Sequence, residues 1–373
     1  MPKIRVLIVD DAVVVRKMLS DTMNKDPAIE VVGVASNGKI CLQKIPQVNP
    51  DIISLDIEMP EMNGLEALDK IREQWPKLPV IMFSTLTQKG ATATLDALSK
   101  GATDYVAKPS KASSLDEGIE LIKSSLIRKI KALCSETVGL DIPFNLPKPK
   151  PVVVHPEDPK NLKGFKRFHR VDIVAIAVST GGPNALAALM PVFSANFPVP
   201  IVVVQHMPPN FTKLLADRLN TKSALKIKEC ESGDILQPGH VYIAPGDYHM
   251  SVEQSKDDVV TLVNQGPPEN SCRPAADVLL RSVAKVFGRN ALAVVMTGMG
   301  QDGLHGCQHI QARGGQVIVQ DEASSVVWGM PGFVVKAKLA DKILSLEQIG
   351  PEIIERSLTG RLASLIAGQK SVK

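Results

Sequence analysis

A chain of 373 residues is long enough for two or three domains that each bury a hydrophobic core, so a small fold held together by metal or disulfides is not needed. The formal net charge of +4 calls for neither nucleic acid nor an anionic membrane as a partner, and no apolar run approaches membrane-spanning length. The five scattered cysteines include no C-x-x-C pair, which excludes a disulfide framework and indicates a reducing cytoplasm (Cys41, Cys134, Cys230, Cys272 and Cys307).

Short apolar segments alternate with stretches of helical period in the first third of the chain. The expected strands are residues 4–9, 31–35, 51–55, 79–83 and 104–107, and residues 64–75 have the period of a helix. This alternation predicts an α/β domain with a doubly wound parallel sheet over residues 1–125.

Chemically active side chains follow the expected strands of this domain. Asp10 and Asp11 end the first strand, Asp56 ends the third, Ser84 ends the fourth, and Lys108 follows the fifth. Parallel strands gather such residues at one edge of the sheet, where carboxylates favour a divalent cation and a lysine can hold a phosphoryl group. Any one acid alone is better explained as a solvated loop residue, but five residues at successive strand ends indicate a site.

Together with "MPEMNGLEAL" after Asp56 and Pro109 after Lys108, these residues resemble the receiver domain of bacterial response regulators. The resemblance covers residues 1–125 and implies that Asp56 accepts a phosphoryl group from a histidine kinase. It implies Mg²⁺ as cofactor of that step, with ligands from Asp10, Asp11, Asp56 and the backbone carbonyl of Glu58. Ser84 and Lys108 would contact the phosphoryl oxygens, and Tyr105 would be the switch rotamer.

A change of composition separates this domain from the rest of the chain. Residues 146–170 are rich in proline and in lysine and arginine, and we interpret residues 126–170 as a helix end followed by a semi-rigid basic linker. Beyond it the α/β rhythm resumes, with expected strands at 172–178, 200–205, 240–244, 291–296 and 316–319 and helical stretches at 183–190 and 274–287. A second doubly wound parallel-sheet domain is therefore expected over residues 171–373.

The sequence "AVSTGG" stops an apolar strand on a serine and two glycines. A strand-to-helix turn that exposes Ser179 needs small neighbours, as in the G-x-S-x-G elbow, although Ala177 replaces the first glycine and a plain turn with a helix cap is the more common explanation for such a stretch alone. His206 and Asp302 also follow apolar strands. One parallel sheet can bring the three together as a Ser-His-Asp triad, which is recognised by geometry and not by chain order.

Other histidines and cysteines are weaker candidates. We interpret His155, His169, His240, His305 and His309 as structural or solvated, and His249 as a candidate substrate contact without strand-end logic. Cys272 precedes a helix with no base adjacent in sequence, which favours an ordinary thiol.

The segment "GMGQDG", residues 298–303, offers a rival interpretation as a dinucleotide-binding loop. It satisfies G-x-G-x-x-G after a strand, and Asp321 and Glu322 follow at the required distance. However, Asp302 would then lie beside a pyrophosphate at a helix N-terminus, where a second anion is unfavourable. The triad is therefore the preferred interpretation, and a receiver-gated oxidoreductase is the alternative.

The order of motifs behind the receiver identifies a resemblance. "VSTGGP", "VQHMPPNFT", "YIAPGDYHM", "RPAADVLL" and "VMTGMGQDG" are similar to the chemotaxis response-regulator methylesterase family (CheB), over nearly the whole chain. The resemblance implies a phosphorylation-activated cytoplasmic hydrolase that removes methyl groups from glutamate γ-methyl esters of methyl-accepting chemoreceptors, releases methanol, and usually deamidates receptor glutamines. It also implies a chemotaxis histidine kinase as phosphodonor.

Family roles map onto Ser179 as nucleophile, His206 as general base and Asp302 as its orienting carboxylate, with Thr180 and Met299 near the oxyanion. The ester step needs no metal or organic cofactor. A different class of function, a phosphorylation-gated interaction module with a vestigial triad, stays open at this stage because hydrogen-bond distances are not visible in a sequence.

Overall fold

The computed structural model describes residues 2–85, 87–108, 118–120, 122–138 and 170–359. The chain divides into two compact units, residues 1–144 and residues 145–373. The expected linker lies largely outside the described residues, as do Pro109, His155 and His169. Among the described residues, no helix combines the length and apolar character needed to cross a membrane.

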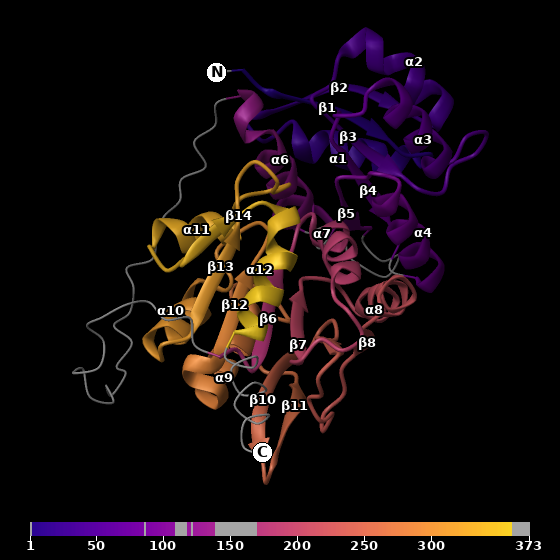
Figure 1. The fold of residues 1–373 in the computed structure, drawn as a ribbon. Coiled ribbons are helices and arrows are strands. Elements are labelled where there is room, and N and C mark those ends of the chain that lie inside the picture. The colour runs from indigo at the N-terminus through magenta and orange to yellow at the C-terminus, as the bar shows by residue number, and fades with distance from the viewer. Residues whose placement is uncertain (1, 86, 109–117, 121, 139–169, 360–373) are drawn as a thin grey trace, which may run out of the picture. The chain divides into compact units, whose positions relative to one another are not determined.

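The first unit contains a five-stranded, fully parallel sheet in the order β2-β1-β3-β4-β5 (Figure 1). Its strands are β1 (Ile4–Val9), β2 (Ile29–Ala35), β3 (Ile52–Asp56), β4 (Val80–Ser84) and β5 (Asp104–Ala107). Chain direction across the sheet reverses between β1 and β3. That reversal is the point where ligands bind in doubly wound sheets, at the carboxyl ends of the strands.

Helices cover both faces of this sheet. They are α1 (Val13–Met23), α2 (Gly38–Val48), α3 (Gly64–Gln74), α4 (Gln88–Ser99) and α6 (Arg128–Val138), the last preceded by a π-helical segment, Ile122–Ile127. One core joins the β1 residues Ile4, Val6 and Ile8 to α1, the π-helical segment and α6. The helix expected at 64–75 begins with a capping box, in which Asn63 accepts from the backbone of Glu66 and the Glu66 carboxylate accepts from the backbone of Asn63.

The second unit contains a seven-stranded parallel sheet in the order β14-β13-β12-β6-β7-β9-β8. Its strands are β6 (Ile173–Val178), β7 (Ile201–Gln205), β8 (Lys226–Glu229), β9 (His240–Ile243), β12 (Ala291–Val295), β13 (Gln316–Gln320) and β14 (Lys342–Leu344). Ala177 on β6 is level with Val204 on β7 and with Val295 on β12. The three central strands therefore end together.

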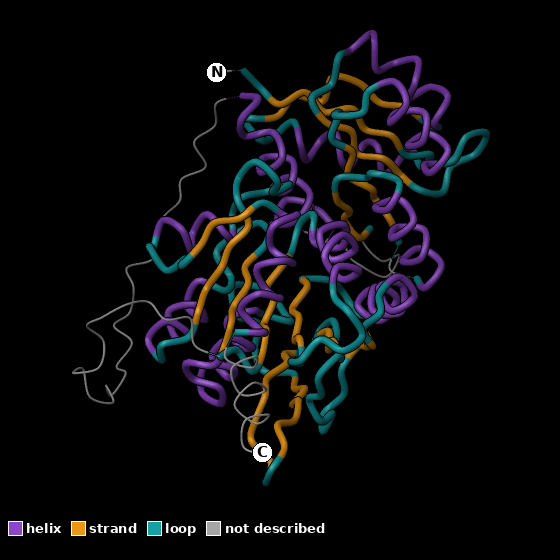
Figure 2. The backbone as a smooth tube through the Cα atoms, in the orientation of Figure 1, coloured by secondary structure: helices purple, strands orange, loops and turns teal. Residues whose placement is uncertain are grey.

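The helices of this unit are α7 (Gly182–Leu189), α8 (Phe211–Lys222), α9 (Ala276–Phe287), α10 (Leu304–Ala312), α11 (Met330–Lys336) and α12 (Leu346–Leu358), with short 3₁₀ turns at Met190–Val192 and Gly288–Asn290. Residues of α9, α10 and α11 pack on one face of the sheet, and α7 contacts both α8 and α12 on the other. Figure 2 shows helices on both sides of the orange strands in each unit.

The two doubly wound parallel sheets predicted from the sequence are confirmed. The sequence analysis missed an antiparallel hairpin, β10 (His249–Ser255) with β11 (Asp258–Asn264), which packs on α9 through Val252 and Met250. Residues 265–275 join the hairpin to α9, and Asn270 and Cys272 of this segment contact Asp302 and His206.

Candidate active site

Ser179 lies directly after β6, in a turn that only small residues permit. Gly181 has a φ of +79°, in the left-handed region that favours glycine. A side chain on Gly182 would collide with Gln205, whose Oε1 lies 1.9 Å from the position of a Cβ. The two glycines of "AVSTGG" thus allow the sharp turn into α7 and the close packing of Gln205 beneath it.

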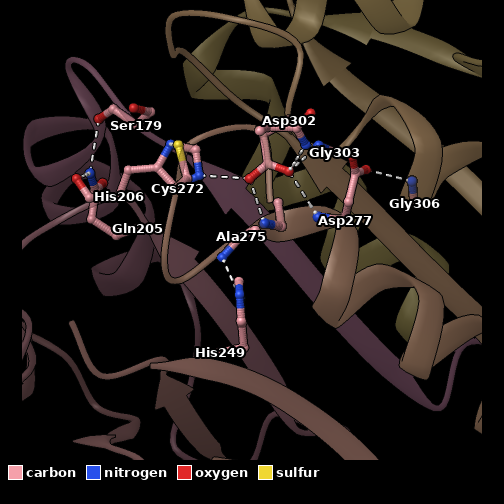
Figure 3. A network of polar contacts seen from close by, with 12 residues as sticks. Ser179, Gln205, His206, His249, Cys272, Ala275, Asp277, Asp302, Gly303 and Gly306 are labelled. Atoms are coloured by element: carbon pink, nitrogen blue, oxygen red, sulfur yellow. Dashed lines mark hydrogen bonds and ion pairs between the residues drawn. The ribbon is translucent and has the colours of Figure 1, made fainter. Parts of the chain in front are cut away.

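His206 follows β7, the neighbour of β6, and its backbone N–H donates to the carbonyl of Val178 at 3.2 Å. Gln205 ties the two strand ends together, because its side-chain amide donates to the carbonyls of Ser179 (3.0 Å) and His206 (3.3 Å) (Figure 3). Ser179 and His206 are therefore brought together by strand pairing, supported by one buried glutamine that the sequence analysis did not identify.

Asp302 lies in the loop between β12 and α10, and its carboxylate is 2 % exposed. Its Oδ2 lies 2.7 Å from His206 Nε2. The backbone N–H groups of Ala276 and Asp277, at the start of α9, donate to Asp302 at 2.5 and 3.0 Å. The positive end of the α9 dipole and these donors favour the ionised carboxylate.

The His206–Asp302 contact sets the proton positions of the pair. Burial alone raises the pKa of Asp302, but the hydrogen bond to His206 and the backbone donors outweigh it and hold this pKa below its usual value. Burial lowers the pKa of His206, and hydrogen bonds to Asp302 and Cys272 reverse this and raise it above the usual value. With Nε2 facing an anion, Nε2 carries a proton and Nδ1 is the ring nitrogen left for proton transfer.

The described residues include no hydrogen bond between the Ser179 hydroxyl and His206. The side chain near Nδ1 is Cys272, with its Sγ at 3.8 Å. In free enzymes the contact between nucleophile and base is often long and tightens only when substrate is bound. The geometry of the pair therefore allows either a hydroxyl or a thiol to use Nδ1.

Thr180 follows Ser179 in the chain, and Met299 follows Gly298, a residue that packs against the serine. Gly298 packs against Ser179, with a hypothetical Cβ only 2.8 Å from that of the serine, and the Thr297 hydroxyl donates to the carbonyl of Thr180 at 2.9 Å. In the part of the chain that the structure describes, the backbone N–H groups of Thr180 and Met299 donate to no protein acceptor. Two such donors next to a serine are suited to an oxyanion.

Two sequence interpretations change at this site, and one residue was missed. His249 is buried, with Nε2 at 3.0 Å from the carbonyl of Pro267 and Nδ1 accepting from Ala275 N–H, so it supports the fold and is not available as a substrate contact. Cys272 has a base beside it, His206, which lies 66 residues earlier in the chain. Asn270 donates to Asp302 and was not identified at all; only its place just before "CRPAAD" could have drawn attention to it.

The dinucleotide interpretation of residues 298–303 is not supported. Asp302 of that loop is committed to His206 and to α9. Asp321, one of the two acids that follow this loop at the distance the dinucleotide fingerprint requires, accepts from the backbone and hydroxyl of Ser324 at 2.9 and 2.6 Å.

A second polar site lies at the strand ends of the first unit. Ligand oxygens of Asp10, Asp11 and Asp56 lie within 4.8 Å of one another. Lys108 Nζ bridges Asp10 and Asp56 at 2.8 and 2.7 Å. A cavity of about 250 Å³ opens beside them, lined by Asp11, Asp56, Ile57, Glu58, Ser84, Thr85, Gly90 and Lys108.

Burial raises the pKa of Asp56 to about 6, because the opposing charge and hydrogen bond of Lys108 compensate only partly. Three crowded carboxylates with hard oxygen donors are suited to Mg²⁺. The side chain of Glu58 is exposed and pairs with Lys89 at 3.0 Å, so only its backbone is left to face the carboxylates. Ser84 donates to the carbonyl of Gly90 at 3.2 Å, and buried Tyr105 has the Lys129 ammonium 5.2 Å from its ring centre.

Comparison with known families covers both units. The family described as CheB methylesterase matches residues 174–353, and the response regulator receiver domain matches residues 6–120.

Two full-length relatives and one solved structure illustrate the similarity. A protein-glutamate methylesterase/protein-glutamine glutaminase of Trichodesmium erythraeum is 51 % identical over 95 % of this chain and 99 % of its own length. One of the same name from a Nocardioides species is 47 % identical over 100 % of both chains. The crystal structure of the Thermotoga maritima CheB methylesterase catalytic domain is 43 % identical, covers 50 % of this chain and 99 % of its own, and has a TM-score of 0.49.

Proposed function

Because this chain belongs to the CheB methylesterase family, and carries a receiver domain ahead of the esterase, we propose that Ser179, His206 and Asp302 perform its ester hydrolysis. The protein is a protein-glutamate methylesterase and protein-glutamine glutaminase under phosphorylation control. It converts glutamate γ-methyl esters of chemoreceptors to glutamate and methanol.

In the acylation step, Ser179 Oγ attacks the ester carbonyl and its proton passes to Nδ1 of His206. Nε2 stays protonated and donates to Asp302, which holds the ring in place and stabilises the imidazolium that forms. The proton then moves from Nδ1 to the departing methoxide, so methanol leaves and an acyl-serine remains.

In the second step, His206 takes a proton from water, the resulting hydroxide attacks the acyl-serine, and the proton returns to Ser179 Oγ. The net change is ester plus water to carboxylic acid plus methanol. With a glutamine side chain the leaving group is ammonia and the remaining steps are unchanged.

The oxyanion of each tetrahedral intermediate would be held by the backbone N–H groups of Thr180 and Met299. Their lack of protein acceptors among the described residues supports this role, since donors already fixed in place need no reorganisation in the transition state. Each such donor contributes about 3 kcal/mol to barrier lowering in enzymes of this kind.

The receiver would accept its phosphoryl group on Asp56: a carboxylate oxygen attacks phosphorus, the bond between phosphorus and the donor's histidine nitrogen breaks, and an aspartyl phosphate forms as that imidazole leaves. Lys108 and Ser84 would contact the phosphoryl oxygens, and Tyr105 would change rotamer with the switch. Mg²⁺, held by Asp10, Asp11, Asp56 and the backbone carbonyl of Glu58, would supply charge neutralisation for this transfer. The phosphodonor would be a chemotaxis histidine kinase, and the receptors' cytoplasmic helices would place the reaction in the cytoplasm.

The observation that carries this assignment is the 2.7 Å contact between His206 Nε2 and the buried carboxylate of Asp302. His206 follows β7, which pairs with β6, and Ser179 follows β6. Methanol release from a methylated receptor fragment tests it. We expect Ser179→Ala to lower turnover by several orders of magnitude while the protein stays folded.

Cys272 is the second candidate nucleophile, because its thiol lies 3.8 Å from Nδ1 of the base. Cys272→Ala is therefore the matched variant, and we expect it to keep at least a tenth of wild-type turnover. The reverse pattern, with Ser179→Ala active and Cys272→Ala inactive, would transfer the nucleophile role to the thiol.

A further inference from the structure

A tight turn at residues 269–272 presents side chains to both members of the His206–Asp302 pair. Glu269 and Cys272 exchange backbone hydrogen bonds of 3.1 and 2.9 Å, and between them Asn270 and Ser271 have φ values of 53° and 61°. Two consecutive non-glycine residues in the left-handed region are unusual, and such conformations persist only where the surroundings hold them. We name residues 269–272 the support turn.

The Asn270 amide lies between two buried carboxylates. Its Nδ2 is 2.9 Å from Asp302 Oδ1 and 2.8 Å from Asp277 Oδ2, and these carboxyl groups are 2 % and 0 % exposed. An amide nitrogen carries exactly two hydrogens, so this one donates to both acids and has none left. A neutral donor shared in this way lets two neighbouring carboxylates lie side by side without a cation.

The other end of the support turn contacts the base. Cys272 Sγ lies 3.8 Å from Nδ1 of His206, on the opposite ring nitrogen from Asp302. Figure 3 shows the thiol beside the imidazole, with Asp302 between the ring and the start of α9. Asn270 thus touches the acid and Cys272 touches the imidazole, from one turn.

The support turn is hydrogen-bonded to α9, the helix whose first backbone N–H groups donate to Asp302. The two terminal guanidinium nitrogens of Arg281 on α9 donate to the Glu269 carboxylate, at 2.5 and 2.6 Å. The first residues of α9 donate to Asp302, so acid and turn share one rigid element. Side chains held by packing and hydrogen bonds of their own are what keep a reacting group in place.

We propose that the support turn is a positioning element for ester hydrolysis, in which Asn270 fixes the Asp302 carboxylate and Cys272 fixes the Nδ1 side of His206. This inference rests on the proposed roles of Ser179, His206 and Asp302. It assigns a positioning role to Asn270 and Cys272 and leaves the attack on the ester to Ser179.

The charged and titratable groups around Asp277 and Asp302 determine how loss of the Asn270 amide changes the pKa values of these two carboxyl groups. They come from the β7 end, the support turn, α9 and α10, and are His206, Glu269, Cys272, Arg281, His305 and Cys307. Burial and the neighbouring charge of Asp302 already raise the pKa of Asp277. Without the amide donor, repulsion between the two acids increases, and the cluster binds a proton more tightly.

The first test compares Asn270→Ala and Asn270→Asp with Ser271→Ala, a matched control whose side chain is exposed in the same turn. We expect Asn270→Ala to lower kcat about ten- to hundredfold with KM within twofold, because the variant displaces the reacting groups and leaves substrate binding unchanged. The acid limb of the kcat/KM profile should move to higher pH in Asn270→Ala and further in Asn270→Asp, and Ser271→Ala should match wild type. Wild-type kcat and an unmoved profile in a folded Asn270→Ala protein would overturn the role of Asn270.

The second test needs no receptor substrate and so separates this inference from the proposed function. Cys272 is half-buried while Cys41, Cys134, Cys230 and Cys307 are buried, so iodoacetamide should label Cys272 first in the native, full-length protein. We expect the labelling rate at neutral pH to fall about tenfold in Asp302→Asn, because the amide no longer holds the imidazole that faces the Cys272 thiol in place. Ser179→Ala, which removes esterase turnover, should label at the wild-type rate. Equal labelling of Asp302→Asn and wild type would refute the thiol–imidazole contact even if Asn270 variants failed to fold.

Discussion

Two buried carboxylates, Asp56 at the end of β3 and Asp302 in the loop after β12, have pKa values that are shifted in opposite directions. Burial raises the pKa of Asp56 to about 6, and the main partner of this carboxylate is the Lys108 ammonium, which it shares with Asp10. Asp302 accepts from His206, Asn270 and the backbone of α9, and its pKa stays below the usual value.

This difference shows how one fold class serves two kinds of chemistry. A carboxylate that must attack phosphorus and bind a cation cannot have its oxygens occupied by fixed donors. A carboxylate that orients a histidine must have them occupied, so that it stays ionised and still. The strand ends position both acids, and the loops that follow decide what each can do.

The largest expected effect comes from removing the Asp302 carboxylate that orients His206. Asp302→Asn should lower methylesterase kcat about ten-thousandfold, because an amide cannot hold the required tautomer of His206. The loss should nearly disappear in a Ser179→Ala background, where residues that act as a unit are non-additive. Methanol release from methylated receptor fragment measures both, and additive losses would argue against a common catalytic unit. Phosphoryl uptake at Asp56 should be unchanged.

The second prediction concerns Asp56 as the carboxylate that attacks phosphorus. Asp56→Asn should abolish phosphoryl uptake and the stimulation that it produces, while unstimulated esterase activity stays within twofold of wild type, because the amide keeps the shape and loses the nucleophile. Mass measurement after exposure to a small-molecule phosphodonor and Mg²⁺ shows whether a phosphoryl group is retained.

Glu58→Gln is the matched control for that experiment, since its side chain is exposed and only its backbone is expected at the cation. It should take up phosphoryl groups normally. A phosphorylated Asp56→Asn protein would mean that another residue accepts the group.

Much of both sites could be predicted from strand ends. Asp56, Lys108, Ser179 and His206 each follow an apolar run directly, and the rule that parallel strands deliver their carboxyl ends to one edge is enough to group them. Asp302 could also be predicted, because only a short glycine-rich loop separates it from the end of β12.

The rest depends on long-range packing that no local pattern encodes. Asn270 and Cys272 belong to a segment placed by the β10–β11 hairpin and by the Arg281 contact, and their partners are 32 and 66 residues away in the chain. Gln205 looked like the last residue of a strand, and only the missing Cβ of Gly182 lets it reach the Ser179 carbonyl.

The third prediction sharpens the comparison through pH. His206 accepts a proton only as a neutral imidazole, and its hydrogen bonds to Asp302 and Cys272 raise its pKa above the usual value. Esterase kcat/KM should therefore continue to rise with pH through the neutral range. Cys272→Ala removes one of the raising contacts, so its midpoint should lie at lower pH than that of wild type. A midpoint that moves upward in Cys272→Ala would contradict this account of the base.

The smallest expected effect concerns stability and isolates the receiver acid. The pKa of Asp56 rises from 3.8 to about 6 on folding, which corresponds to at most roughly 3 kcal/mol of stability that protonation supplies. This stability is present below pH 3.8 and is lost as pH rises to about 6, so at neutral pH the ionised carboxylate destabilises the receiver.

Asp56→Asn should then raise the receiver's melting temperature by a few degrees at neutral pH in the presence of a chelator. The advantage should shrink as pH falls from 6 toward 4, where wild type becomes protonated too. It should also shrink when Mg²⁺ is added, because cation binding stabilises wild type by mass action. Calorimetry of the full-length protein measures all three, and an Asn variant that is less stable than wild type in chelator would show that the Lys108 pair more than offsets the cost of burying Asp56.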